Sequence, residues 1–184
     1  MRILGISGSL RSASHNTALL RAVGELLPDG IEIELYDGLA ELPHYNGDDD
    51  HDAPPAAVTA LRDAIAGADA ILIATPEYNA SVPGVLKNAV DWASRPHRES
   101  ALWGKTAAVI GASPGAYGAL WAQADLRKAL GTAGARVLDR DLPVARAAEA
   151  FDADGRLADP ALAARLREHV GALVELATPA EIAA

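Results

Sequence analysis

The sequence predicts an α/β fold in which helices cover both faces of a five-stranded parallel sheet, a three-layer sandwich. Two observations support this prediction. Apolar runs of strand length alternate with stretches of helical periodicity along the chain, as in repeated βαβ units. Several of these runs, such as Ala70–Thr75, are almost continuously hydrophobic, which is typical of parallel strands buried on both faces.

Length and composition favour one globular domain. The 184 residues are half hydrophobic and show no linker or internal repeat, so we expect residues 1–184 to form a single domain. No run approaches the roughly 18 apolar residues that span a bilayer. Met1 enters a strand almost directly and cysteine is absent, so we expect a cytoplasmic protein. A net charge of −9 argues against nucleic acid and membrane as partners.

Five segments have the composition of strands. The second contains the alternation Ile-Glu-Ile-Glu-Leu, which places it at a sheet edge with one face in water. The expected strands are Arg2–Ile6, Ile31–Tyr36, Ala70–Thr75, Thr106–Gly111 and Arg136–Asp139.

Five further segments have helical periodicity. The first should end at Pro28-Asp29-Gly30 and the third before Pro96, because proline and glycine are common stop signals. The expected helices are His15–Leu27, Pro55–Ala66, Val82–Ser94, Tyr117–Thr132 and Pro160–Ala177.

The loop after the first strand, GSLRSASHN, has the composition of a phosphate site. Gly8 lets a ligand approach the backbone closely, and the next helix would direct its free N–H groups and positive dipole end at the ligand. Arg11 adds a charge-assisted donor fork. A serine-rich turn that merely caps the helix is the alternative interpretation. The candidate ligands are Ser9, Arg11, Ser14, His15, Asn16 and Thr17, of which His15 could equally well only pack.

The loop after the third strand, Pro76-Glu77-Tyr78-Asn79, has the composition of a site for a flat ring. Pro76 fixes a rigid bend, after which backbone N–H groups can point at a heterocycle. Tyr78 offers an aromatic face, and Asn79 offers both a donor and an acceptor. A plain strand-to-helix turn is the alternative.

Three other chemistries are disfavoured. The segment Gly111–Gly115 fits the hydrolase pattern G-x-S-x-G, but Pro114 lacks the N–H that an oxyanion would need. The acidic segments Asn46–Asp52 and Asp152–Gly155 are expected to be solvated turns, and no metal site is predicted. Neither a Walker A motif nor G-x-G-x-x-G is present, so Asp37 is interpreted as a turn residue.

The two candidate loops are expected to meet. In the flavodoxin-like strand order 2-1-3-4-5, loops after the first and third strands lie at the crevice where ligands bind. A phosphate loop and a ring loop at one crevice together indicate FMN.

Both motifs, G-S-x-R-x-x-S-x-N and P-E-Y-N-x-S-x-P-G-x-L-K-N-A-x-D-W, resemble those of the NADPH-dependent FMN reductase family, which includes chromate, quinone and azo reductases. The resemblance covers about Met1–Val144. It implies a flavodoxin-like fold and an FMN site built from the residues above, closed by Ser113 and Gly115. The stretch Ala116–Gln123 departs from the family pattern, in which a glycine-rich run and a basic residue precede Ala-Gln.

The resemblance implies an NAD(P)H-dependent oxidoreductase that passes hydride from NADPH or NADH through FMN to quinone, chromate, azo or flavin-type acceptors by a ping-pong mechanism. No side chain needs to act as an acid, base or nucleophile, because the flavin supplies the chemistry. Two alternatives remain open, a flavodoxin-type electron carrier and a flavin-free interaction domain.

The fourth expected helix indicates self-association. One apolar face, from Ala119 to Ala133, suits the sheet, whereas a second face contains Tyr117, Leu120 and Trp121. A monomer needs only one apolar stripe, so the second resembles an interface, to which Trp92 could contribute. Family members are dimers or tetramers, and we expect a homodimer or homotetramer. Local packing of Trp121 on its own loop is the alternative.

Overall fold

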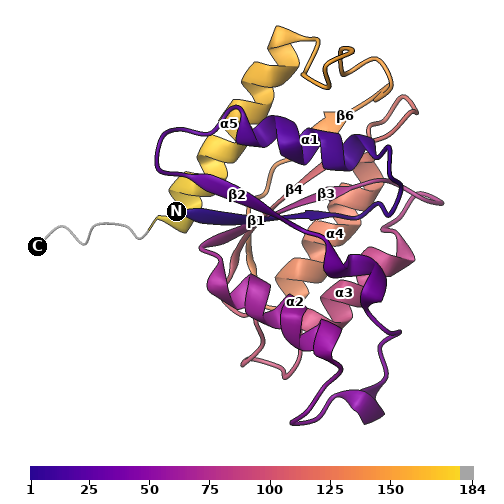
Figure 1. Ribbon diagram of the computed structural model, residues 1–184, viewed down its shortest axis with the longest axis vertical. Helices are drawn as coiled ribbons and strands as arrows, with labels where there is room; N and C mark the ends of the chain where they lie inside the picture. The colour runs from indigo at the N-terminus through magenta and orange to yellow at the C-terminus, as the bar shows by residue number, and fades with distance from the viewer. Residues whose placement is uncertain (179–184) are drawn as a thin grey trace, which may run out of the picture.

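The computed structural model describes residues 1–178 and confirms the α/β prediction (Figure 1). The sheet runs in the order β2-β1-β3-β4-β5, β6 also pairs with β4, and every pair is parallel. The strands are β1 (Arg2–Ser7), β2 (Glu32–Tyr36), β3 (Ala70–Thr75), β4 (Thr106–Ala112), β5 (Arg136–Val137) and β6 (Pro143–Val144).

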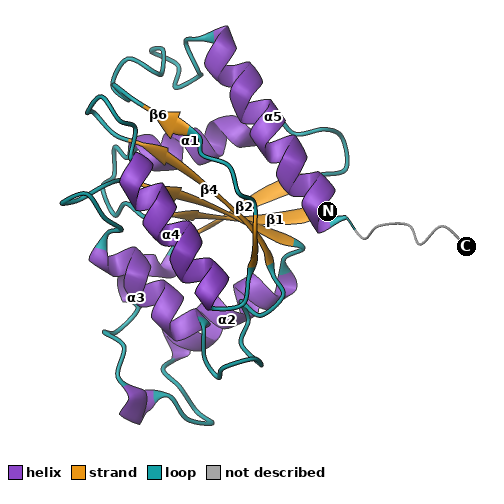
Figure 2. Ribbon diagram, turned by 180° about the vertical axis from the view of Figure 1, so that it is seen from behind, coloured by secondary structure: helices purple, strands orange, loops and turns teal. Residues whose placement is uncertain are grey.

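The helices form two layers around this sheet (Figure 2). Helices α1 and α5 cover one face and α2, α3 and α4 cover the other, so the three-layer prediction is confirmed. No helix in this part of the chain is long and apolar enough to cross a membrane. The helices are α1 (His15–Gly24), α2 (Ala56–Gly67), α3 (Gly84–Ala93), α4 (Leu120–Thr132) and α5 (Pro160–Ala177), with 3-10 turns at Gly38–Glu41 and Gly47–Asp49.

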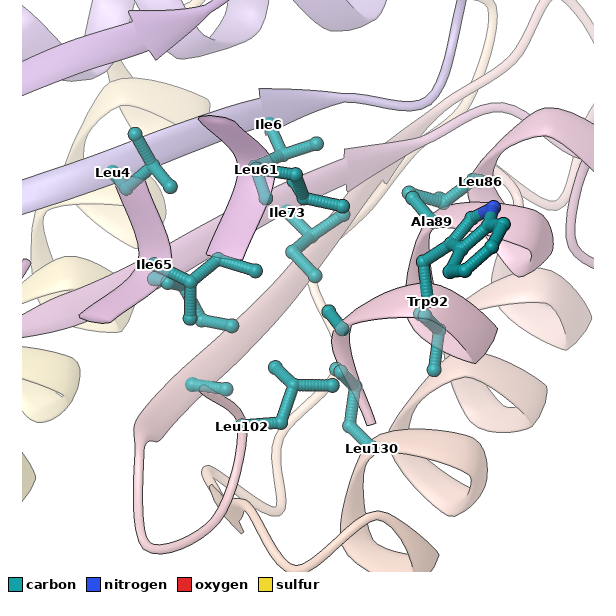
Figure 3. Packing of buried hydrophobic residues seen from close by; sticks show 14 of the residues in the cluster. Leu4, Ile6, Leu61, Ile65, Ile73, Leu86, Ala89, Trp92, Leu102 and Leu130 are labelled. Carbon is teal, nitrogen blue, oxygen red and sulfur yellow. The ribbon is translucent and has the colours of Figure 1, made fainter. Parts of the chain in front are cut away.

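Each face of the sheet has its own hydrophobic core. On one side Leu61 and Ile65 of α2, together with α3 and Leu130 of α4, pack against strand residues such as Ile73 (Figure 3). On the other side leucines of α1 and α5 pack against β3 and β4. The central strands β3 and β4 are buried along their whole length, whereas the glutamates of β2 are exposed, as expected for an edge strand.

The fifth strand differs from the prediction. The expected Arg136–Asp139 strand ends at Val137, and the chain rejoins the sheet as β6. The amide of Leu138 still donates to Ala107 in β4, but Arg140 then turns back onto the Leu138 carbonyl. The Asp139–Asp141 segment that leaves the sheet pairs with Arg127 of α4. The expected strand is therefore two residues shorter than predicted, and β6 is a strand that the sequence did not predict.

The fourth helix begins three residues later than expected, at Leu120. Gly118 and Ala119 both adopt a positive φ, 58° and 62°, which a helix cannot continue. A Cβ at Gly118 would lie 2.5 Å from the backbone nitrogen of Val144, so only glycine fits there. The loop after β4 is therefore packed directly against β6.

Candidate cofactor site at the carboxyl edge of the sheet

The loops after β1, β3 and β4 converge at one edge of the sheet (Figure 1). The Gly8 amide donates to the carbonyl of Ala74 in β3 at 2.8 Å. A Cβ at Gly8 would lie 2.7 Å from Leu86 and 3.2 Å from Pro76. Contacts this close require glycine, and they bring the first loop directly against the second.

The first loop leads into α1 as predicted. Ser14 is the N-cap, and its hydroxyl accepts from the Thr17 amide at 3.2 Å. The Thr17 hydroxyl donates to Ser7 at 2.9 Å, which ties the helix start to the end of β1. The amides of His15 and Asn16 precede the first intrahelical bonds, so they point out of the helix N-terminus.

Arg11 is exposed on this loop. Its backbone amide donates to the Ser9 hydroxyl at 3.4 Å. No carboxylate within residues 1–178 forms a salt bridge with its guanidinium, in contrast to Arg62 and Arg127. Arg11 therefore has its full donor capacity available for an anion.

Asn16 has a different place from the one expected. Its side chain is buried and bonded twice to the backbone of Ala112, accepting from the amide and donating to the carbonyl, both at 3.0 Å. Both polar atoms of the Asn16 side chain are therefore already bonded, because the end of β4 lies against the start of α1. Asn16 fixes α1 to the end of β4, and only its backbone N–H remains directed at the crevice.

His15 lies under the segment that follows β6. Its ring stacks on Phe151 with centroids 6.3 Å apart and planes only 6° from parallel. Phe151 also forms a β-bridge with Leu157, so a small closed turn covers this side of the helix start. His15 thus packs, at the margin of the site.

The second loop turns back on itself after Pro76. Tyr78 and Ser81 exchange backbone hydrogen bonds of 3.2 and 3.1 Å around Asn79 and Ala80, whose φ angles are 53° and 58°. Two consecutive left-handed residues make this a type I′ turn. The turn displays Tyr78, which is 51% exposed, at the mouth of the crevice. Its position suits a surface for a flat ring.

Glu77 has a role that the sequence alone did not reveal. Its carboxylate accepts from the Ala122 amide at 3.1 Å, in the first turn of α4. Helix α4 has Ala119 as its N-cap and no capping side chain of its own there. The charge of Glu77 therefore complements the positive end of α4 across a separation of 45 residues.

The third loop is held by backbone bonds and by Gln123. The Ser113 amide donates to Val144 at 3.1 Å, and the Ser113 carbonyl accepts from Ala147 at 3.0 Å. Gln123 is fully buried, donates to the Gly118 carbonyl and accepts from the Leu142 amide, both at 3.0 Å. These contacts leave Ser113 half-buried and Gly115 exposed at the crevice.

The remaining residues of the longer motif support the site from behind. Asn88 of α3 accepts from the Tyr45 amide at 2.7 Å and donates to the Pro43 carbonyl at 2.8 Å. Trp92 donates to the same Pro43 carbonyl and is fully buried (Figure 3). The expectation that Trp92 joins an interface was therefore wrong, because the 43–45 loop covers it.

The structure thus brings the loops that carry most predicted site residues to one edge of the sheet, with Asn16 and Glu77 occupied by other elements. It adds Gln123 and Gly118, which position the third loop. Their signals in the sequence were weak, because a glutamine inside a helix and a glycine before one have many ordinary explanations.

Several known proteins are similar to this chain. Residues 1–149 match the family model for NADPH-dependent FMN reductases. The NAD(P)H-dependent FMN reductase of Pseudomonas aeruginosa is 45% identical over 174 residues, covering 94% of this chain and 93% of that protein. The 2-hydroxy-1,4-benzoquinone reductase of a Burkholderia species is 47% identical over 127 residues, covering 69% and 68%.

One solved structure has the same architecture with substantial identity. The flavoenzyme NAD(P)H:(acceptor) oxidoreductase FerB from Paracoccus denitrificans superposes with a TM-score of 0.84 at 41% identity, covering 96% of each chain. The family model, the relatives and this structure therefore point to one family. This chain belongs to the NADPH-dependent FMN reductase family of flavodoxin-like oxidoreductases.

Proposed function

We propose that this reductase, as a single domain, binds FMN non-covalently at the carboxyl edge and uses NADPH or NADH to reduce quinones and related small acceptors, among them chromate, azo compounds and flavins. One observation supports the proposal most strongly. An arginine without a salt bridge and a capped helix N-terminus lie on one side of Gly8, and the Pro-Glu-Tyr-Asn turn lies directly on the other.

The residues present fit FMN. The hydroxyl of Ser9, the Arg11 guanidinium and the first amides of α1 supply donors for a phosphate that bears nearly two negative charges. Gly8 lets the first loop pack against Pro76, so that the donors of the first loop and the Pro76–Asn79 turn lie together. Pro76–Asn79 and the Ser113–Gly115 loop offer backbone groups and one aromatic face for the ring, and Ser14 and Thr17 keep the helix start in place.

The protein contributes binding and orientation. FMN, when bound, supplies the redox chemistry, taking hydride from a nicotinamide and passing electrons to an acceptor. The β3 and β4 loops and Tyr78 would hold the ring and exclude water from it, and Glu77 and Gln123 keep these loops in place against α4. Ser113 is assigned to binding, because Pro114 lacks the N–H of an oxyanion site and Ser113 forms no hydrogen bond with a histidine in the described chain.

Steady-state kinetics test this proposal. If donor and acceptor use one exposed ring face in turn, initial-rate plots at several fixed quinone concentrations should be parallel, the ping-pong pattern. A flavodoxin-type carrier would bind FMN but would not turn over with NADPH and a quinone. A flavin-free interaction domain would be purified without flavin absorbance. Intersecting lines would contradict the shared face.

We also propose a homodimer or homotetramer that uses the start of α4. Tyr117 and Trp121 are 61% and 46% exposed and lie 4.7 Å apart between ring centroids. A groove of about 530 Å³ also lies between α3 and α4, lined by Lys87, Asp91, Asp125 and Lys128 among others. Exposed aromatics beside a groove with charges of both signs suit a second copy of the chain.

A further inference from the structure

Backbone strain is concentrated at the edge of the sheet that holds the candidate site. Five non-glycine residues among those described have a positive φ, and four of them follow the carboxyl ends of β3, β4 and β6. Left-handed conformations of this kind are uncommon and cluster at functional sites. Asn79, Ala80 and Ala119 shape the loops already described. Arg146, with a φ of 47°, is the fourth and bears a charge.

Arg146 is held in this conformation by the loop after β4. Its amide donates to the carbonyl of Gly115 at 3.0 Å, and the next amide, that of Ala147, donates to Ser113 at 3.0 Å. The Arg146 carbonyl accepts from the Glu149 amide at 2.8 Å. The strained residue is therefore fixed beside Ser113 and Gly115 in the loop after β4.

The side chain of Arg146 is available to a ligand. It is 75% exposed, and its salt bridge to Glu149 is long, at 4.0 Å, with a partner that is 78% exposed. In a chain of net charge −9, an anionic ligand needs local cations to bind. Arg11 is assigned to the FMN phosphate, and Arg146 is a second exposed cation on the loops at this edge of the sheet.

We infer that Arg146 binds the 2′-phosphate of NADPH and thereby gives this reductase a preference for NADPH over NADH. The inference rests on the proposed function. NADPH and NADH differ only in this phosphomonoester, which bears nearly two negative charges. An arginine fork can contact it with two parallel charge-assisted hydrogen bonds, and Glu149 competes for the same guanidinium.

Two substitutions with opposite effects test the inference in the FMN-loaded protein. Arg146→Gly removes the charge and keeps the left-handed backbone without strain, so folding should be preserved. We expect the KM for NADPH to rise about tenfold and the KM for NADH to stay within about twofold. Glu149→Gln should lower the KM for NADPH alone. Arg156→Ala, which removes an exposed arginine from the same segment, is the control and should change neither constant.

Calorimetry provides a readout that does not need turnover. Adenosine 2′,5′-bisphosphate should bind the wild-type protein more tightly than AMP, and Arg146→Gly should abolish the difference. Equal effects of Arg146→Gly on both nicotinamides, or weaker FMN binding instead, would overturn the inference. If neither nicotinamide reduces the bound FMN of the wild-type protein, the proposed function fails, and the calorimetric comparison still decides whether Arg146 contacts the 2′-phosphate.

Discussion

Arg11 is the residue on which cofactor affinity should depend most. It is exposed, forms no salt bridge within residues 1–178 and lies beside the N-terminus of α1. A charge-assisted hydrogen bond to phosphate contributes about 1.5–3 kcal/mol. Arg11→Ala should therefore weaken FMN about tenfold to a hundredfold in a fluorescence titration. Riboflavin, which lacks the phosphate, should bind far less well than FMN, and equal affinities for the two would refute the phosphate assignment.

His169 should make folding stability depend on pH. It is 3% exposed on α5 and its Nε2 has no hydrogen-bond partner in the described chain. Burial, reinforced by the charge of Arg140 and partly offset by Asp141, lowers the pKa of His169 from 6.5 to about 4. The unfolded chain therefore takes up a proton that the folded chain excludes, and stability is lost as the pH falls from 6.5 towards 4.

Denaturant unfolding at several pH values checks this. His169 should make the free energy of unfolding about 2 kcal/mol smaller at pH 5 than at pH 7. His169→Gln should remove that part of the pH dependence, whatever its effect on stability at pH 7. The exposed His44, changed to glutamine, is the control and should leave the dependence intact. The same slope in His169→Gln and wild type would show that the buried imidazole is not its source.

For single residues, the sequence was informative where the interacting groups lie close together along the chain. Gly8, Arg11 and Ser14 act within a few residues of one another, so their order along the chain predicted their arrangement. Asn16 and Glu77 were harder to interpret, because their partners Ala112 and Ala122 are 96 and 45 residues away. No periodicity or spacing in the sequence encodes such a pairing, and side chains that seemed directed at a ligand proved to hold other elements.

Among the elements, the link between the β3 loop and α4 should be the most sensitive. Glu77 supplies the cap that α4 lacks, so Glu77→Ala should cost about 1 kcal/mol of folding stability and loosen FMN as the turn shifts. Glu77→Gln keeps an acceptor oxygen and should recover part of both losses. Chemical denaturation and FMN titration of the two variants check this, with the exposed Glu25→Ala as control. If Glu77→Ala and the wild-type protein had the same stability and the same affinity for FMN, a capping role would be excluded.

Element types were predictable and some boundaries were not. The apolar runs of β1, β3 and β4 and the alternation in β2 are strong signals, because burial on one or two faces dictates the composition directly. The fifth strand ends two residues early and β6 was not predicted, because the segment between them, in which Asp139 and Asp141 pair with Arg127, leaves the sheet. The delayed start of α4 depends on contacts of Gly118 with β6, which only the folded chain reveals.

For the whole molecule, the start of α4 should determine the assembly state. Trp121→Arg places a charge in the exposed aromatic pair with Tyr117, so we expect the wild-type oligomer to dissociate to monomers with the fold intact. Light scattering at micromolar concentration, with circular dichroism for the fold, measures this. Ala60→Arg on the exposed side of α2 is the control and should not dissociate it. A wild-type monomer would end the proposal, and Trp121 would then only pack on Tyr117.

The whole fold has a consequence for the reaction. A parallel sheet brings every strand's carboxyl end to one edge, so the loops after β1, β3 and β4 form one crevice although they are far apart in sequence. If donor and acceptor use this edge in turn, as proposed, the enzyme completes one half-reaction before it begins the other.

Anaerobic reduction tests this account most directly. The FMN-loaded protein is mixed with one equivalent of NADPH in the absence of any acceptor, and the visible flavin absorbance is followed. The account predicts that the absorbance bleaches stoichiometrically and returns when a quinone is added. A bound flavin that NADPH and NADH both leave oxidised would contradict a nicotinamide-dependent reductase and would favour an electron carrier.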